Sequence, residues 1–183
     1  MKNPSFGWPL ALVCTALLVP LIHGCATPAP MVAPLNDGQL AIPADYKSWP
    51  KFLSAVQRPE VKQVREIYMS PASRSATAAS GFANGTVFVM ENYAAQASAD
   101  GTLATGPDGK LVKGNLLRVF VMGKNAGWGQ AAPEALRNGN WIYTAFMADG
   151  QKSADDLNTC RACHVPLAGK DFVARYDEHF STR

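Results

Sequence analysis

The chain has 183 residues, with 17 lysines and arginines against 14 acidic side chains and a formal net charge of +3. No cluster of basic residues indicates nucleic-acid binding. The roughly 140 residues from about position 40 onward suffice for one domain and are too few for two.

The first 24 residues have the pattern of a signal peptide. Lys2 is followed by an uncharged apolar stretch, residues 6–22, and then by small residues. Two prolines inside this stretch make a membrane-spanning helix a poorer interpretation. The residues up to Cys25 also resemble a bacterial lipoprotein box, in which the cysteine becomes the lipidated first residue of the mature chain. The alternative is ordinary cleavage nearby, with Cys25 discarded.

Residues 25–43 are rich in alanine, proline and threonine, which predicts an extended tether. Ala26 rather than an acidic residue follows Cys25, and by analogy with Gram-negative lipoproteins this favours the outer membrane over the inner one. We therefore expect a periplasmic protein that meets the membrane only through a lipid on Cys25. The ordered domain is expected over residues 44–183.

Short elements separated by turn signals fill residues 44–147. Runs of β-branched and aromatic residues predict strands, pairs such as Asn84-Gly85 predict turns, and Asp45 is a candidate helix cap. The predicted order is a short helix near 44–49, a strand at 61–69, a short helix at 71–80, and strands at 86–90, 116–122 and 141–147.

The most informative sequence feature is Cys160-Arg-Ala-Cys163-His164. Two thiols three positions apart can form thioethers with the two vinyl groups of one porphyrin, and the adjacent imidazole can coordinate its iron. A zinc site is disfavoured because zinc usually takes four ligands, and only His23 and His179 remain among the histidines. A thioredoxin-like redox pair would need a βαβ pattern, which the sequence does not show. The motif therefore predicts one covalently attached haem c, with His164 as the iron ligand.

The position of this motif distinguishes between cytochrome architectures. Small helical cytochromes carry it near the N-terminus and supply a downstream methionine, whereas only residues 165–183, without methionine, follow His164. Four-helix cytochromes place the motif near the C-terminus but need long amphipathic helices, which residues 61–147 do not show. We therefore expect an α+β fold, a mainly antiparallel β-sheet with short helices and a C-terminal helix that carries the haem motif.

Between about residues 40 and 180 the chain resembles the cytochrome P-460 family and its relative cytochrome c′-beta. The resemblance rests on short motifs in a shared order: Asp45-Tyr46 with Trp49, Arg65 to Tyr68 followed by Pro71, Phe82 to Val87, Gly139 to Trp141, Cys160 to His164, and Asp171 to Val173. It implies a homodimer built on antiparallel sheet, a c-type haem with His164 proximal, and an open or weakly ligated distal face. The P-460 branch implies oxidation of hydroxylamine, and the c′-beta branch implies binding of nitric oxide and carbon monoxide.

Two positions depart from the P-460 branch. There, a lysine in the strand after the Asn/Asp-Gly-Thr turn is bonded to the porphyrin, and by register that position is Met90. A thioether cannot replace the lysine amine, so the cross-link is expected to be absent unless Lys110 or Lys113 reaches the ring. The branch also uses a distal carboxylate as proton acceptor. The nearest equivalent is Arg118, which cannot accept a proton because its pKa stays above about 12.

Other residues have alternative interpretations. Arg65 matches a family arginine near the haem and is a candidate to hydrogen-bond a distal ligand or a propionate, with a solvent-facing strand arginine as the alternative. Met90 is a candidate to pack over the porphyrin or to ligate the iron, with a core methionine as the alternative. His179 is expected to be exposed on a polar tail. Trp128 and Trp141 are expected in the core or at a dimer contact.

Two classes of function follow from these residues. The first is an exported monohaem cytochrome that binds nitric oxide or carbon monoxide, or transfers electrons to a redox partner. The second is a haem oxidoreductase that oxidises hydroxylamine or a related nitrogen species at the same iron. The second class needs a proton acceptor and a modified porphyrin, and neither Met90 nor Arg118 supplies them. The sequence therefore favours the first class.

Overall fold

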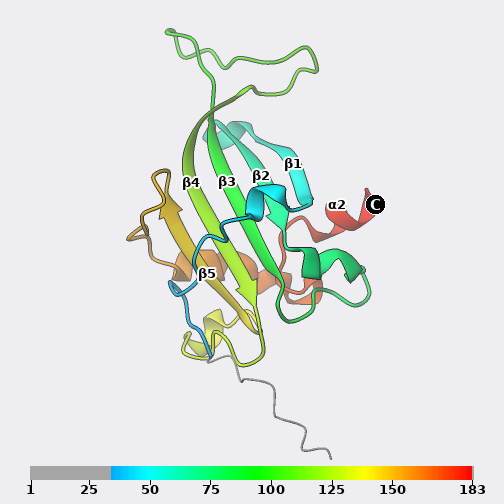
Figure 1. Ribbon diagram of the computed structural model, residues 1–183. Coiled ribbons are helices and arrows are strands. Elements are labelled where there is room, and N and C mark those ends of the chain that lie inside the picture. Colours follow the sequence, from blue (N-terminus) through cyan, green and yellow to red (C-terminus); the bar gives the residue numbers. More distant parts are fainter. Residues whose placement is uncertain (1–33, 183) are drawn as a thin grey trace, which may run out of the picture. The chain divides into compact units, whose positions relative to one another are not determined.

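A five-stranded antiparallel sheet, in the order β1-β2-β3-β4-β5, forms the centre of the computed structural model, which describes residues 34–182 (Figure 1). The strands are β1 (Lys51–Arg58), β2 (Gln63–Met69), β3 (Val87–Ala95), β4 (Lys113–Lys124) and β5 (Trp141–Met147). The helices are α1 (Asn158–His164), α2 (Tyr176–Ser181) and the 3-10 helices η1 (Tyr46–Ser48), η2 (Pro59–Val61), η3 (Pro71–Ser75), η4 (Glu134–Leu136) and η5 (Val165–Lys170). The expected fold class is confirmed. Within the described range, no helix is both long and apolar enough to cross a membrane.

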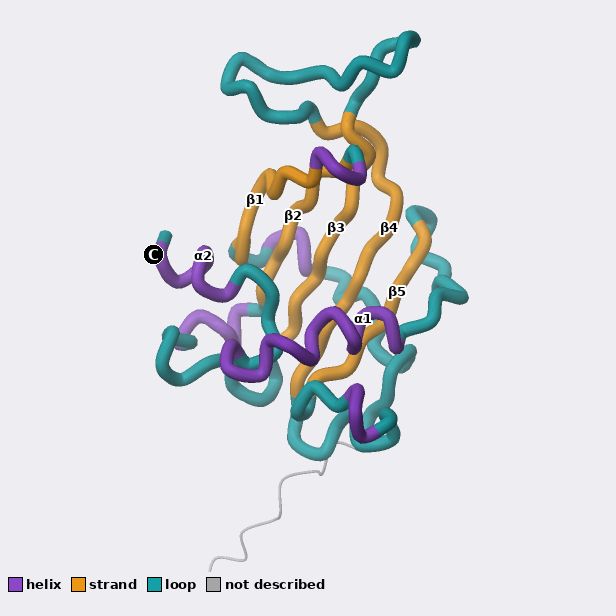
Figure 2. Tube along the Cα trace, turned by 180° about the vertical axis from the view of Figure 1, so that it is seen from behind, coloured by secondary structure: helices purple, strands orange, loops and turns teal. Residues whose placement is uncertain are grey.

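Each face of the sheet carries its own apolar core. The first core includes Val89 and Ile142, and residues 34–50 run across it, in front of the strands in Figure 1. The second core includes Phe88 and Trp141, and the C-terminal part of the chain with α1 and α2 runs across it (Figure 2). Because successive side chains of a strand point to opposite faces, neighbouring residues such as Phe88 and Val89 serve different cores.

The pairing of β2, β3 and β4 decides which side chains meet on the second face. Met90 of β3 lies opposite Ile67 of β2 and opposite Phe120 of β4. Arg118 lies opposite Asn92, two residues further along β3. The cross-strand neighbour of Met90 on β4 is therefore Phe120 and not Arg118.

Two elements differ from the sequence-based expectation. Strand β1 is not predicted because register shifts interrupt its pairing with β2, and Ala55 within it has φ +50°. Such a bulge breaks the alternation of apolar and polar residues by which a strand is recognised. The helix expected at 71–80 is only the 3-10 helix η3, since the backbone is already extended at Ala76.

The segment expected to be a tether contacts the domain where the structure describes it. Leu35, Leu40 and Ile42 pack in the first core, and the Gly38 amide donates to the Tyr143 carbonyl at 2.8 Å. These apolar residues bury surface, so the domain includes residues before 44. The expected signal peptide, Cys25 and the rest of the tether lie outside the described residues.

Candidate functional site

A cavity of about 440 Å³ lies on the second face of the sheet, between the strands and the segment that carries α1. Its walls include the apolar side chains Phe52, Ile67, Met90, Phe120 and Met122, and Cys160, Cys163 and His164 also line it. The volume falls within the range of about 300–1,000 Å³ that is usual for cofactor and ligand pockets. The structure thus brings the cysteine motif and Met90 to one cavity.

His164, the last residue of α1, is held by a backbone carbonyl. Its Nδ1 lies 2.6 Å from the carbonyl oxygen of Phe172, and its ring centroid lies 5.2 Å from that of Tyr143. A carbonyl only accepts hydrogen bonds, so Nδ1 carries the proton and Nε2 keeps its lone pair. Burial lowers the pKa of His164, against the opposing effect of the Phe172 carbonyl. Burial thus favours the neutral imidazole, and the Phe172 carbonyl favours the form that binds a metal through Nε2.

Cys160 and Cys163 lie on successive turns of α1 and form no disulfide. Cys160 is half-buried and Cys163 is exposed. Burial is the largest of the effects that raise the pKa of the Cys160 thiol. Two free thiols beside an oriented imidazole form the set of groups that would hold a c-type haem.

The charged groups of the cavity also fit a haem with its two propionates. Three arginines line it, Arg58, Arg65 and Arg175, and none of its described lining residues is acidic. The buried Nε of Arg65 and the buried hydroxyl of Tyr143 have no hydrogen-bond partner within residues 34–182. Burial first, and then the positive charge of Arg58, lower the pKa of Arg65. A bound group with carboxylates would supply both an acceptor and the opposite charge.

The charged side chains considered for the distal face lie elsewhere. Arg118 is outside the cavity lining, pairs with Asp155 and donates to the Ser153 hydroxyl at 2.9 Å. Lys110 pairs with Asp108 at 3.6 Å, and Lys113 pairs with Glu66 at 3.5 Å; neither lysine lines the cavity.

The expectation that His179 is exposed is wrong, because its exposed fraction is 3%. Its Nδ1 lies 2.8 Å from the Phe52 carbonyl oxygen, and its ring stacks on Phe52 at 4.2 Å. Helix α2 places Tyr176, His179 and Phe180 at the i, i+3, i+4 spacing of one helical face, which packs on the second core. Trp128 and Trp141 are buried, as a core role requires.

Two buried charged residues escaped the sequence analysis. Glu91, next to Met90 but on the opposite face, has an exposed fraction of 0%. It accepts hydrogen bonds from the hydroxyls of Tyr46 (2.6 Å), Tyr68 (3.1 Å) and Tyr93 (2.8 Å). Tyr93 follows Glu91 by two residues in β3, but no local sequence signal joins Tyr46 and Tyr68 to Glu91, because they come from η1 and β2.

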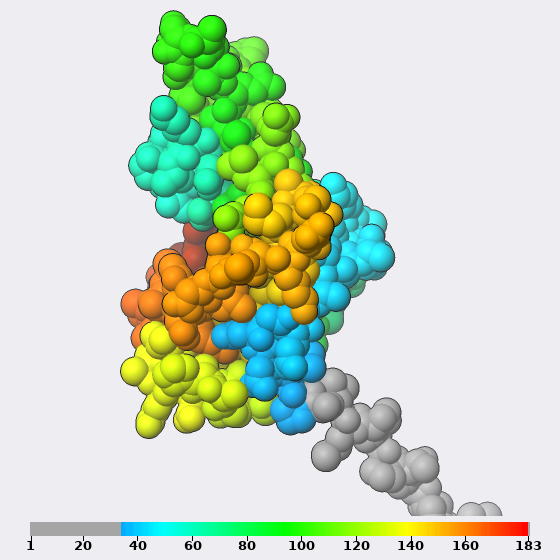
Figure 3. Space-filling view, turned by 90° about the vertical axis from the view of Figure 1, so that its left-hand side faces the viewer, coloured from blue at the N-terminus to red at the C-terminus, as the bar shows by residue number. Residues whose placement is uncertain are grey.

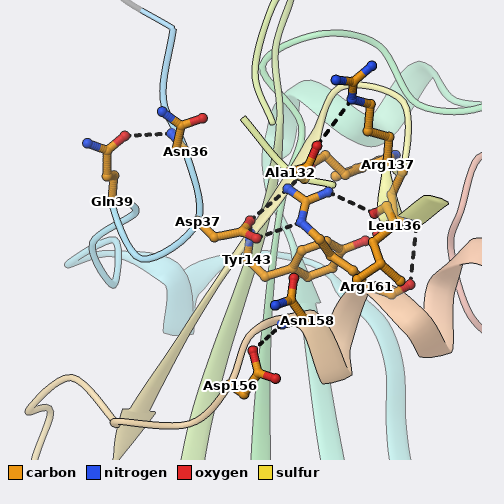
Figure 4. A network of polar contacts seen from close by, with 12 residues as sticks. Asn36, Asp37, Gln39, Ala132, Leu136, Arg137, Tyr143, Asp156, Asn158 and Arg161 are labelled. Carbon is orange, nitrogen blue, oxygen red and sulfur yellow. Dashed lines mark hydrogen bonds and ion pairs between the residues drawn. The ribbon is translucent and has the colours of Figure 1, made fainter. Parts of the chain in front are cut away.

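The second is Arg161, which stands between the two cysteines of the motif and is 1% exposed. Its guanidinium donates to Asp37 through Nε (2.6 Å) and Nη2 (2.9 Å), and to the carbonyls of Leu136 (3.3 Å) and Trp141 (3.2 Å), as Figure 4 shows in part. In Figure 3 residues 34–45, in blue, lie side by side with residues 150–165, in orange. The ion pair thus fixes α1 to the segment that precedes the first strand.

The sheet, the cavity and its donor set are those expected of a haem-binding α+β protein. The family model of cytochrome P460 matches residues 43–175, and the chain belongs to the cytochrome P460 family. This confirms the resemblance found in the sequence motifs and identifies a haem cytochrome. The comparison with curated proteins finds no match.

Proposed function

We propose that the protein is an exported c-type cytochrome with one haem, which binds nitric oxide or carbon monoxide, or transfers single electrons. Cys160 and Cys163 hold the porphyrin through thioethers, and His164 is the proximal iron ligand. The haem, when bound, supplies a redox-active iron that takes a small ligand on its distal side. Arg65, with Arg58 and Arg175, balances the charge of the propionates.

The composition of the cavity wall carries this proposal. Met90, Ile67 and Phe120 are cross-strand neighbours that line the cavity, and no lysine or carboxylate belongs to its described lining. Nitric oxide and carbon monoxide are uncharged and release no proton on binding, so an apolar wall suits them. Hydroxylamine oxidation releases protons and needs a side chain that accepts them.

The remaining parts of the proposal come from the sequence and from the family resemblance. The signal peptide at residues 1–24 supports export to the periplasm, and Cys25 supports a lipid anchor in the outer membrane. The family resemblance supports a homodimer. A redox protein is the partner that electron transfer would require.

The test is the absorption spectrum of the purified ferrous protein, alone and with each gas. We expect an unmodified c-type haem, high-spin and five-coordinate, whose spectrum changes on addition of nitric oxide or carbon monoxide. His164→Ala, as a control, is expected to lose the axial imidazole while it keeps the thioether-bound haem. A six-coordinate ferrous haem that binds neither gas would contradict the gas-binding function.

A further inference from the structure

The carbonyl that binds His164 belongs to a turn with an unusual backbone. Asp171 has φ +50° and Phe172 has φ +58°, a left-handed conformation that residues with a side chain rarely adopt. Two such residues in succession persist only where the surrounding structure holds them. The side chain of Asp171 is in a position to do this.

The Asp171 carboxylate fixes the turn to three other parts of the chain. It accepts hydrogen bonds from the Phe82 amide (2.8 Å), from Lys124 Nζ (2.8 and 2.9 Å) and from Trp141 Nε1 (3.3 Å). Lys124 also donates to the Phe82 carbonyl at 2.6 Å. The side chains of Asp171 and Lys124 are each 18% exposed, so water competes only weakly for this ion pair.

Close packing leaves the turn little room to move. A Cβ at Gly139 would lie 3.2 Å from the Phe172 ring, and one at Gly81 would lie 3.1 Å from Asp171 Oδ2. Both glycines also have positive φ, which is strained for any residue with a side chain. Glycine at these two positions therefore lets the neighbouring backbone pack closely against the turn. Asp171 itself is not among the residues that line the cavity. Its hydrogen bonds can reach His164 through the Phe172 carbonyl, which belongs to the same turn.

We infer that Asp171 is a positioning residue for the axial histidine. It holds the turn that places the Phe172 carbonyl on Nδ1, and so sets the orientation and the donor strength of the His164 imidazole. This inference rests on the proposed role of His164 as the iron ligand. A hydrogen bond donated by Nδ1–H strengthens the bond from Nε2 to iron and favours the ferric state. A looser turn weakens both effects.

The experiment compares the haem-loaded wild type with Asp171→Asn and Lys124→Met. Resonance Raman spectroscopy of the ferrous proteins gives the Fe–His stretching frequency, and a redox titration gives the reduction potential. We expect a lower Fe–His frequency in both variants. The lost charge itself also shifts the reduction potential, upward in Asp171→Asn and downward in Lys124→Met, so the Fe–His frequency is the deciding measurement in both.

Asp177→Asn is the matched control. Asp177 forms an ion pair with Lys170 in the same C-terminal segment and is 71% exposed, so its replacement removes the same charge without touching the turn. We expect the wild-type Fe–His frequency in this variant.

The outcomes separate the inference from the proposed function. An Fe–His band missing from the wild type, or unchanged in His164→Ala, would overturn the proposed axial role of His164 and the inference with it. A wild-type band that keeps its frequency in the haem-loaded variants would overturn the inference alone. If Asp171→Asn does not fold, Lys124→Met decides, because it leaves the Phe82 and Trp141 hydrogen bonds to Asp171 in place.

Discussion

Met90 lies directly opposite Phe120 across β3 and β4, and both side chains line the cavity. A thioether and a phenyl ring neither cross-link to a porphyrin as a lysine does nor accept a proton. We predict that the wild type does not turn over hydroxylamine with an artificial electron acceptor. Robust turnover in that assay would contradict the gas-binding proposal.

Met90 and Phe120 are also the positions at which substitutions could introduce hydroxylamine oxidation. We predict that Met90→Lys with Phe120→Glu gains measurable turnover, since both new groups face the cavity. The matched control is Met90→Lys with Arg118→Glu, which adds the same groups but places the carboxylate outside the lining. A gain of equal size in the control would show that Phe120 is not the distal position.

Replacement of both Cys160 and Cys163 by alanine is predicted to abolish covalent haem. The thioethers need both thiols, whereas His164 alone gives only a reversible bond to iron. The measurement is haem staining after denaturing electrophoresis of protein made with a haem-attachment system. Wild-type protein that contains zinc and no haem would refute the covalent assignment.

Glu91→Leu is predicted to lower the free energy of unfolding by about 1–3 kcal/mol, the usual cost of a buried polar group left without its partner. The buried hydroxyls of Tyr46 and Tyr68 and the half-buried hydroxyl of Tyr93 lose their acceptor, whereas Lys47 is 66% exposed and remains in contact with water. Chemical denaturation measures the change. Glu60→Gln is the control, because Glu60 is 55% exposed and its replacement should leave the free energy of unfolding nearly unchanged.

Glu91 also predicts how stability depends on pH. Burial acts to raise its pKa, but hydrogen bonds from Tyr46 and Tyr93 and the charge of Lys47 outweigh burial and hold the pKa below its ordinary 4.5. The resulting stabilisation is complete above the ordinary pKa and is lost as the pH falls through the lower folded value. Thermal unfolding should therefore become easier below about pH 4.5, and less steeply so in Glu91→Gln. Equal slopes in the two proteins would exclude this role.

Asp37→Ala is predicted to destabilise the protein by about 3–5 kcal/mol, because the buried Arg161 guanidinium keeps its charge without a counter-ion. Arg118→Ala is the comparison, since Arg118 and Asp155 are 35% and 40% exposed and such pairs contribute about 1 kcal/mol or less. Thermal unfolding of the haem-loaded proteins measures both. Similar losses would show that burial of Arg161 does not matter.

Cys25→Ser is predicted to release the protein from membranes or to stall its processing, because a lipid on Cys25 is the proposed anchor. Membrane fractionation and mass spectrometry of the N-terminus measure this. A fully soluble wild type with an unmodified N-terminus downstream of Cys25 would exclude the anchor.

Most of the sheet can be predicted from the sequence, because each of the strands β2 to β5 contains several β-branched and aromatic residues and turn signals separate the strands. Strand β1 cannot, since the bulge at Ala55 disturbs its alternation. Helix α2 has an amphipathic pattern, but its charged residues also suggest an exposed polar tail. For that reason the burial of His179 is not predicted from the sequence.

In the site, the motif from Cys160 to His164 is recognisable because its chemistry fixes its spacing. The sequence-based choice of Arg118 misses the position opposite Met90 by two residues. A long connection joins β3 to β4, and no local sequence pattern specifies the register with which the two strands pair. The Phe172 carbonyl also escapes prediction, since any residue type carries a carbonyl and only the fold places this one on His164.

Met90 and Glu91 occupy consecutive positions of β3, and a slip of that strand by one residue would exchange the faces they occupy. The slip would carry a carboxylate into the cavity, and it would leave Tyr46 and Tyr68, which lie outside β3, without their acceptor. These two tyrosines therefore also keep a base away from the haem. An insertion or deletion that shifts β3 by one residue would change the side chains of the cavity and would also remove Glu91 from the opposite core. The chemistry of the cavity and the stability of the domain therefore depend on the same strand register.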